Sequence, residues 1–207
     1  KEVPLLGLLP DVMLFDSNME LERMPLLLER NSPYLEFYEK LRTNLHRQGS
    51  QPPKVLVLSS GVKGEGKTFC AYNLAIAAAR AGKRTLIIEA DLRSPSEAES
   101  LNIIPHPYSY LEPLHYYGDI NDCIRQVPEI ENLYMIPSPG VIKQPGGIIE
   151  SSEMQRLLSD VRYRFDFVIL DAPCMTQNND AFILEPHTDG MIIVARPHYT
   201  CLLYTSD

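Results

Sequence analysis

Five short, mainly apolar runs are spread along the chain, and each has the length of a strand. They lie at residues 55–58, 85–88, 133–136, 167–170 and 191–194. Because these runs do not alternate with polar residues, they predict a mostly parallel sheet covered on both faces. A helix-like stretch from Lys67 to about Arg80 separates the first two runs, and Gly82 follows it as a C-terminal cap. This order predicts a βαβ unit with parallel strands.

A helix is predicted before the first strand, where apolar residues recur at helical spacing. Its apolar stripe consists of Phe37, Leu41 and Leu45, with Tyr38 beside them. Ser32 is a suitable N-cap for this helix, and Pro33 is a suitable first residue. Glu36 and Lys40 are expected to form an ion pair on the exposed side, because they are one helical turn apart.

Three other parts of the chain complete the outline. Residues 1–30 contain Leu and Pro without clean periodicity and predict a linker or docking segment with one short helix. Residues 94–147 include seven prolines between Pro105 and Pro145, which exclude long helices. Ser152 and Gln155 form a capping-box pattern that predicts a helix start. We therefore expect an α/β fold, with a segment at 1–30 and one domain over 31–207.

Composition narrows the class of protein. The 207 residues are 44% hydrophobic, which suits a globular domain with its own core. The net charge of -8 argues against a general nucleic-acid binder, because that function requires a basic face. The four cysteines form no C-x-x-C pair, and no apolar run approaches the ~20 residues that span a bilayer. These features predict a chain that is itself soluble and cytoplasmic.

A glycine-rich motif follows the first strand run. It reads Gly61-Val62-Lys63-Gly64-Glu65-Gly66-Lys67-Thr68 and satisfies the P-loop pattern G-x-x-x-x-G-K-[ST]. Glycines let backbone N–H groups converge on phosphate, Lys67 reaches the β- and γ-phosphates, and the Thr68 hydroxyl ligates magnesium. The helix start, which includes Phe69, points at the same anion. The alternative is a chance glycine-rich turn, but the position between a strand and a helix favours a site for ATP and Mg²⁺.

Carboxylates follow two of the strand runs. Asp171 comes directly after 167–170, and Glu89 and Asp91 follow 85–88. Because ligands of parallel sheets bind at the carboxyl ends of strands, these side chains are candidate magnesium ligands beside the P-loop. Arg93 is a candidate partner for these carboxylates or for phosphate. The alternatives are an ordinary strand-ending aspartate at Asp171 and a solvated acidic loop around Asp91.

Three segments together resemble the Walker segments of bacterial tyrosine kinases, the kinase domains of capsular and exopolysaccharide co-polymerases. They are residues 61–68, 87–95 and 167–173, and the most specific part is Asp91-Leu92-Arg93-Ser94-Pro95. Further similarity is found at residues 6–10, which look like the segment that joins the membrane domain to the kinase, and at 38–45, 188–190 and 196–197.

The resemblance implies a P-loop fold related to cell-division and partition ATPases. It implies transfer of the ATP γ-phosphate to tyrosine, largely between subunits of a homo-oligomeric ring. Lys67, Asp91 and Asp171 are then the expected catalytic residues, and Thr68, Glu89, Asp91 and Asp171 are expected at the metal. A membrane co-polymerase or activator domain, in cis or in trans, is the implied partner. The implied location is the inner face of the plasma membrane, and no nucleic acid is expected.

The chain departs from the family pattern at several positions. Glu89 replaces an aspartate, Lys63 stands where proline is usual, and Glu39 replaces an arginine in the helix that forms the ring. The sequence also stops soon after Pro197, before the family's adenine-contacting residues and tyrosine cluster. We therefore expect a truncated reading frame, in which residues 201–207 resemble translated adaptor sequence.

Two other functions remain open. A partition-type ATPase switch carries a signature lysine five positions before Lys67, where this chain has Val62. A non-catalytic ATP-binding scaffold of the same fold is consistent with Glu89, Glu39 and the missing tyrosine cluster. The sequence favours a protein-tyrosine autokinase that regulates capsular or exopolysaccharide polymerisation and export.

Overall fold

Six strands form one sheet within the part of the chain that the structure describes, in the order β3-β4-β2-β5-β1-β6. The structure is a computed structural model, and it describes residues 3–11, 31–95, 101, 103–104 and 120–197. The strands are β1 (Val55–Ser60), β2 (Thr85–Glu89), β3 (Arg125–Gln126), β4 (Leu133–Ile136), β5 (Phe167–Asp171) and β6 (Met191–Val194). All neighbouring strands are parallel except β3 and β4. The predicted mostly parallel sheet is therefore confirmed.

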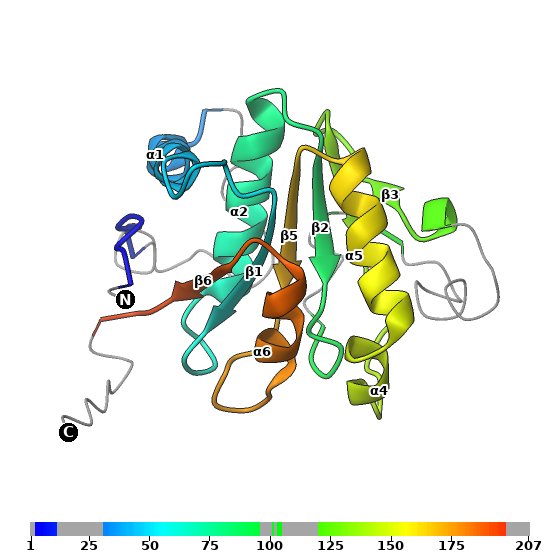
Figure 1. The fold of residues 1–207 in the computed structure, drawn as a ribbon. Helices are drawn as coiled ribbons and strands as arrows, with labels where there is room; N and C mark the ends of the chain where they lie inside the picture. The colour runs from blue at the N-terminus through cyan, green and yellow to red at the C-terminus, as the bar shows by residue number, and fades with distance from the viewer. Residues whose placement is uncertain (1–2, 12–30, 96–100, 102, 105–119, 198–207) are drawn as a thin grey trace, which may run out of the picture.

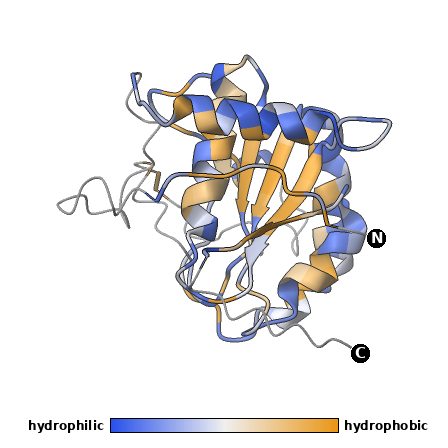
Figure 2. Cartoon of the chain, turned by 90° about the vertical axis from the view of Figure 1, so that its left-hand side faces the viewer, coloured by the Kyte–Doolittle hydropathy of each residue, from blue (hydrophilic) through white to orange (hydrophobic). Residues whose placement is uncertain are grey.

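Helices cover both faces of this sheet. They are α1 (Leu35–His46), α2 (Lys67–Arg80), α4 (Gly146–Ile149), α5 (Ser152–Arg164) and α6 (Asp180–Leu184), with the 3-10 turns η4 (Ile120–Asp122) and η5 (Glu185–His187). α1 and α2 lie on one face, and α4, α5 and α6 lie on the other (Figure 1). Figure 2 shows the apolar strands enclosed between the helices. This arrangement explains the strand runs, because both faces of the central strands are buried.

The predicted strands are all present. β4 and β6 have the predicted bounds, and β1, β2 and β5 extend slightly further at their carboxyl ends. β1 and β2 point the same way, as the βαβ pattern predicts, but β5 lies between them and pairs with both. The short strand β3 has no counterpart in the prediction, because two residues carry no periodic pattern.

Helix α1 differs from its prediction at its start and along one edge. It begins at Leu35, whereas Ser32 Oγ accepts a hydrogen bond from Tyr34 N in the preceding turn. The buried residues of the helix are Tyr38, Leu41 and Leu45. Phe37 is 39% exposed, so the prediction that it belongs to the core stripe is wrong. Successive helical residues are rotated by about 100°, which turns Phe37 away when Tyr38 faces the core.

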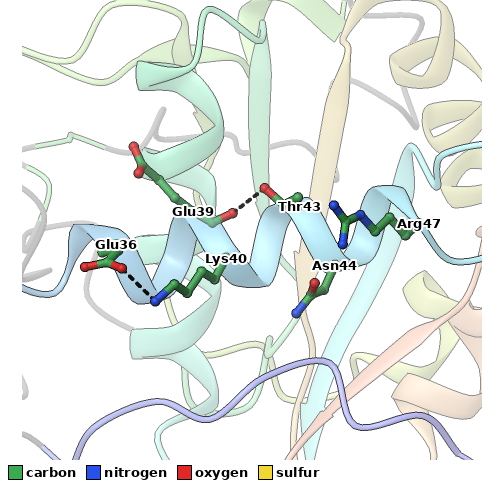
Figure 3. A pocket seen from close by; sticks show the side chains of 6 residues that line it. All are labelled: Glu36, Glu39, Lys40, Thr43, Asn44 and Arg47. Carbon is green, nitrogen blue, oxygen red and sulfur yellow. Dashed lines mark hydrogen bonds and ion pairs between the residues drawn. The ribbon is translucent and has the colours of Figure 1, made fainter.

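The exposed face of α1 is polar and carries the expected ion pair. Lys40 Nζ lies 2.6 Å from Glu36 Oε1 (Figure 3). A hollow runs along this face, and it is lined by Glu36, Glu39, Lys40, Thr43, Asn44 and Arg47. Both partners of the ion pair are exposed, so the pair adds little to stability.

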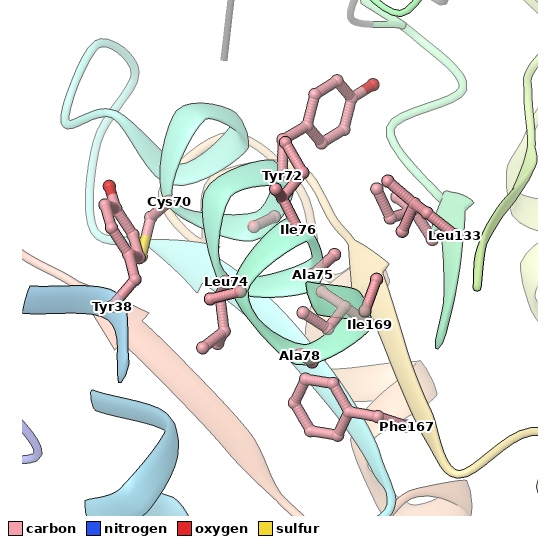
Figure 4. Close-up of a cluster of buried hydrophobic side chains, with 14 of the residues drawn as sticks. Tyr38, Cys70, Tyr72, Leu74, Ala75, Ile76, Ala78, Leu133, Phe167 and Ile169 are labelled. Carbon is pink, nitrogen blue, oxygen red and sulfur yellow. The ribbon is translucent and has the colours of Figure 1, made fainter. Parts of the chain in front are cut away.

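Helix α2 is the central buried helix and carries the P-loop at its start. Residues 70–79 are all buried, and the helix contacts α1, β1, β2 and β5. Figure 4 shows it between Tyr38 of α1 and Phe167 and Ile169 of β5. Burial raises the pKa of the Cys70 thiol to about 12, so this thiol stays protonated. A helix so firmly packed gives the loop before it a fixed position.

Helix α5 is capped one residue earlier than predicted. Ser151 Oγ accepts a hydrogen bond of 3.1 Å from Met154 N, which makes Ser151 the N-cap in place of Ser152. Ser152 is already helical, and its hydroxyl contacts Glu153 instead. Of the two adjacent serines, the cap is the one with the extended backbone that an N-cap requires.

Residues 3–11 form an N-terminal segment that lies against α1 and near the end of β6. Asn44 Nδ2 donates a hydrogen bond of 2.8 Å to Leu6 O, and Leu6 and Leu9 pack on the core of α1 and α2. The short helix expected within residues 1–30, the boundary at residue 30 and the tail at 201–207 lie outside the described residues. No helix in the described ranges is long and apolar enough to cross a membrane.

Candidate nucleotide and metal site

The predicted P-loop connects the carboxyl end of β1 to the first turn of α2. Residues 61–66 form the loop, and Lys67 is the first helical residue. Gly64 and Gly66 have φ values of 90° and 85°, a left-handed conformation that residues with side chains rarely adopt. The loop therefore leads directly into a helix N-terminus, which is the arrangement that binds phosphate in P-loop proteins.

The Lys67 ammonium lies between two carboxylates. Lys67 Nζ is 3.2 Å from Asp91 Oδ2 and 3.5 Å from Asp171 Oδ1. Asp171 ends β5 and is fully buried, whereas Asp91 follows β2 and is 8% exposed. Thr68 Oγ1 donates a hydrogen bond of 2.7 Å to Asp171 Oδ2. The structure thus brings together four residues that the sequence places at the site.

Burial and charge act in opposite directions on this cluster. Burial alone lowers the pKa of Lys67, but the carboxylates of Asp171 and Asp91 outweigh it, and the net effect is a raised pKa. For Asp171, burial is the largest effect and raises the pKa, while the Lys67 charge and the Thr68 hydrogen bond oppose it. Lys67 therefore stays charged near neutral pH, and the ionised form of Asp171 depends on its two partners.

The segment that follows β5 runs beside the P-loop. Met175 N donates to Ser60 O at 2.9 Å, and Thr176 N donates to Gly61 O at 3.2 Å. The Ser60 hydroxyl donates to Val62 O at 2.8 Å, inside the loop itself. These hydrogen bonds satisfy backbone groups that the fold removes from water, and they fix the loop relative to the strand that carries the buried aspartate.

Glu89 ends β2 and is 1% exposed, but its oxygens meet other partners. Ser138 N donates to Glu89 Oε2 at 2.7 Å, and the Tyr72 hydroxyl lies 3.4 Å from Oε1. Glu89 and Asp91 lie on the same side of the sheet, because alternate residues of a strand share a face and both contact residues of α2. Asp91 and Asp171 contact the Lys67 ammonium of the P-loop, whereas Ser138 N and the Tyr72 hydroxyl hold Glu89. The geometry therefore favours Asp91 and Asp171 over Glu89 as metal ligands.

Arg93 is directed at a carboxylate that the sequence does not single out. Its Nη2 lies 3.1 Å from Asp180 Oδ1, and Asp180 is 2% exposed at the start of α6. Asp91 Oδ1 accepts a hydrogen bond of 3.1 Å from Ser94 N, which holds the turn between them. Asp180, like Tyr72 and Ser138, belongs to no motif, so only the fold reveals these contacts.

The remaining predicted residues lie in the loop and in the first turn of α2. Lys63 has an exposed side chain at the tip of the loop. Val62 N donates to Glu65 Oε2, and Glu65 is 6% exposed. Phe69 lies in the first turn of α2, where its carbonyl accepts a hydrogen bond of 2.9 Å from Asn73 Nδ2. These residues shape the loop and the helix start, where backbone N–H groups are available to an anion.

The oxygen atoms at this site fit magnesium. The Thr68 hydroxyl and the carboxylates of Asp91 and Asp171 are hard donors of the kind that Mg²⁺ prefers. Within the described ranges, no group of three or more His, Cys, Asp or Glu residues is arranged to hold a metal by itself. Magnesium usually binds one or two carboxylates together with substrate phosphates, so the donor set suits a magnesium–nucleotide complex.

Comparison with known proteins places the chain in a family. Residues 54–202 match the family model described as an AAA domain, so the chain belongs to this class of P-loop NTPases. It is 30% identical over 159 residues to the tyrosine-protein kinase CpsD of Streptococcus pneumoniae, which covers 77% of this chain and 69% of that protein. It is also 30% identical to the tyrosine-protein kinase ptk of Acinetobacter johnsonii, over 84% of this chain and 24% of the relative. The chain therefore belongs to the bacterial tyrosine-protein kinases.

Solved structures share the fold of this chain. The chimerical protein CapA2B2 is 26% identical, with a TM-score of 0.76 over 92% of this chain and 79% of that one. The kinase domain of Escherichia coli ETK has a TM-score of 0.84 over 96% of this chain and 80% of that one, and at 22% identity it shows the fold alone. The cell-division ATPase MinD of Pyrococcus furiosus shares the fold with a TM-score of 0.60. The partition-type switch is not favoured, since the relatives that share 30% identity with this chain are tyrosine kinases.

Proposed function

We propose that this chain binds ATP with magnesium at the P-loop and transfers the γ-phosphoryl group to a tyrosine hydroxyl. The observation that carries the proposal is the Lys67 ammonium, held within 3.5 Å of both Asp91 and Asp171 at the start of α2. Phosphoryl transfer depends mainly on a positive charge placed at the phosphates and on oxygen ligands that position the metal ion. This cluster offers the Lys67 ammonium for the first and carboxylate oxygens for the second. Membership in the bacterial tyrosine-protein kinases supports tyrosine as the acceptor.

Different residues of the cluster bind the phosphates and the magnesium ion. Lys67 exchanges its contacts with the two carboxylates for contacts with β- and γ-phosphate oxygens, where its charge offsets the charge of the nucleotide. The loop N–H groups and the helix N-terminus bind the same phosphates. Thr68, Asp91 and Asp171 would hold magnesium, which neutralises phosphate charge when it is bound.

The transfer step needs a nucleophile and a proton acceptor. The tyrosine oxygen attacks the γ-phosphorus, the bond from that phosphorus to the β–γ bridging oxygen breaks, and ADP leaves. The phenolic proton passes to a carboxylate, because a hydroxyl with a pKa of about 10 is a weak nucleophile in its neutral form. We assign this carboxylate to Asp91, since it lies nearer the surface than the fully buried Asp171.

The partner that we propose is a membrane-bound polysaccharide co-polymerase or activator domain, with which the chain acts at the inner face of the membrane in capsule or exopolysaccharide export. The similarity of residues 6–10 to the family's joining segment supports this. We also propose a ring of copies that uses the exposed face of α1. Glu39 lies on that face, so the charge reversal noted in the sequence falls on the proposed contact.

Phosphotyrosine formation tests the proposed reaction. The purified chain is incubated with ATP and MgCl2, with and without membranes that contain the co-polymerase, and phosphotyrosine is detected by immunoblotting. We expect a signal that Lys67→Met and Asp91→Asn abolish. The exposed residue Glu131 provides the control variant Glu131→Gln, which should keep the signal. If the wild-type chain binds ATP but forms no phosphotyrosine under either condition, on itself or on an added tyrosine-containing peptide, the catalytic proposal is wrong and the chain is a nucleotide-binding scaffold.

A further inference from the structure

Glu65 is a buried carboxylate inside a loop whose expected ligand is an anion. Its exposed fraction is 6%. Glu65 Oε2 accepts a hydrogen bond of 2.8 Å from Val62 N, and Oε1 accepts one of 3.2 Å from Arg196 N. One side chain thus connects the beginning of the P-loop to the backbone just beyond β6.

A buried carboxylate in this loop destabilises the protein unless its hydrogen bonds offset the cost of burying its charge. Burial of an ionised group costs free energy, and a negative charge near phosphate adds repulsion. The two backbone N–H groups offset part of this cost, because they donate to the charged form. Since the side chain repels an anion rather than binding one, its contacts point to a role in holding the loop.

The backbone of Arg196 is itself held through its side chain. Arg196 Nη2 lies 2.7 Å from Asp11 Oδ2, at the end of the N-terminal segment. That segment is attached to α1 by the hydrogen bond from Asn44 to Leu6 O. Figure 1 shows the segment beside α1, on the same side of the molecule as β6. A continuous series of contacts therefore leads from the N-terminal segment through Arg196 and Glu65 into the P-loop.

We propose that Glu65 is a positioning residue of the P-loop, and that the contacts Asp11–Arg196–Glu65 couple docking of the N-terminal segment to the affinity of the loop for ATP. The inference rests on the proposed function, because it concerns the phosphates bound at this loop. With the segment docked, Arg196 fixes the end of β6, and Glu65 holds Val62 N–H in the binding shape of the loop. Release of Asp11 loosens that support and weakens ATP binding. Coupling is reciprocal, so ATP favours the docked segment to the same extent.

Substitutions of Glu65 test the positioning role. Glu65→Gln keeps the size of the side chain but replaces one acceptor oxygen with an NH2 group, which cannot accept from an N–H. We expect the Kd for ATP, measured by calorimetry in MgCl2, to rise about tenfold, the loss of one hydrogen bond to a charged group. Glu65→Ala removes both contacts and should weaken binding further. Glu131→Gln removes the same charge at an exposed position and should leave the Kd unchanged.

Double variants test the coupling. Arg196→Gln removes the guanidinium but keeps the backbone N–H that donates to Glu65. It therefore breaks only the ion pair with Asp11, as Asp11→Asn does from the other side. We expect each to raise the Kd for ATP about threefold, in keeping with a partly exposed ion pair. In the Glu65→Gln background, the same two substitutions should have a smaller effect or none, because the connection to the loop is already weakened. If these residues only stabilise the fold, the substitutions should lower the melting temperature, but their effect on the Kd for ATP should not depend on whether residue 65 is Glu or Gln.

The outcomes separate this inference from the function on which it rests. An unchanged Kd in Glu65→Gln would overturn the positioning role, and additive effects in the double variants would overturn the coupling. Both results leave ATP binding by the wild-type chain intact, so the proposed function would survive them. A wild-type chain that binds no ATP would instead overturn the proposed function and this inference together.

Discussion

Thr68 Oγ1 donates a hydrogen bond of 2.7 Å to Asp171 Oδ2, although the two residues are 103 positions apart in the chain. Thr68 lies in the first turn of α2, and Asp171 is the last residue of β5. The bond joins the helix that follows the P-loop to the buried aspartate of the neighbouring strand. It also places a hydroxyl beside the Lys67 ammonium, at 3.3 Å.

Removal of this hydroxyl tests its part in magnesium-dependent binding. Thr68→Val keeps the shape of the side chain but loses the donor to Asp171 and one oxygen ligand. We expect the Kd for ATP in MgCl2 to rise about tenfold, the effect of one lost hydrogen bond to a charged group. Thr68→Ser should restore most of the affinity, because it retains the hydroxyl. Equal affinities of Thr68→Val and wild type would exclude the hydroxyl from the site.

Glu89 and Asp91 can be distinguished by magnesium titration. Asp91→Asn should raise the magnesium concentration needed for half-maximal ATP binding, because it weakens a metal ligand. Glu89→Gln retains an acceptor for Ser138 N, so it should lower stability by about 1 kcal/mol and leave the magnesium midpoint unchanged. Both quantities are measured on the same samples, by calorimetry and by denaturant unfolding. A shifted magnesium midpoint in Glu89→Gln would show that Glu89 is a metal ligand.

Much of the fold can be predicted from local patterns in the sequence. The strand runs are apolar because both of their faces are buried, and α2 has the predicted bounds because a glycine motif precedes it and Gly82 follows it. The failures are also local. Ser32 lies before the N-cap position of α1, and Ser152 is already the first residue of α5, so neither serine is the cap. Which residue becomes the cap depends on backbone angles that residue type does not determine.

The site could be predicted only in part, because some of its residues stand in sequence motifs and others are defined only by contacts with distant parts of the chain. Lys67, Thr68 and Asp171 stand at fixed places in a motif or at a strand end, so the sequence indicates them directly. Glu89 meets its backbone donor 49 positions away, in the turn after β4, and the partner of Arg93 lies 87 positions away. Such long-range contacts leave no periodic trace in one sequence, so they appear only once the sheet order is known.

The pair of Arg93 and Asp180 is expected to be structural. The Asp180 side chain is 3% exposed and that of Arg93 is 36% exposed, so their attraction is only partly screened by water. A double-mutant cycle with Arg93→Met and Asp180→Asn should give a coupling of about 1 kcal/mol in the free energy of unfolding. Arg93→Met should leave the Kd for ATP near that of wild type. A large loss of ATP affinity with wild-type stability would place Arg93 at the phosphates instead.

Asp189 should contribute a pH-dependent part of the stability. Lys54 N and Val55 N donate to its Oδ2 at 2.7 and 2.8 Å, and Arg162 Nη1 lies 2.7 Å from Oδ1. Burial acts to raise the pKa of Asp189, but the backbone hydrogen bonds and the Arg162 charge outweigh it, so the folded pKa lies below the ordinary value. A lowered folded pKa stabilises the protein above the unfolded pKa, about 3.9 for Asp, and this stability is lost as the pH falls through the folded value.

Asp189→Asn isolates that contribution. Because the carboxylate is partly exposed, we expect the substitution to lower the free energy of unfolding by about 1 kcal/mol at neutral pH. The difference from wild type should shrink below about pH 4 and disappear once Asp189 is protonated in the folded chain. Denaturant unfolding at a series of pH values measures it, and Asp122→Asn, at an exposed aspartate, is the matched control. A difference that stays constant into strong acid would show that the carboxylate charge is not its cause.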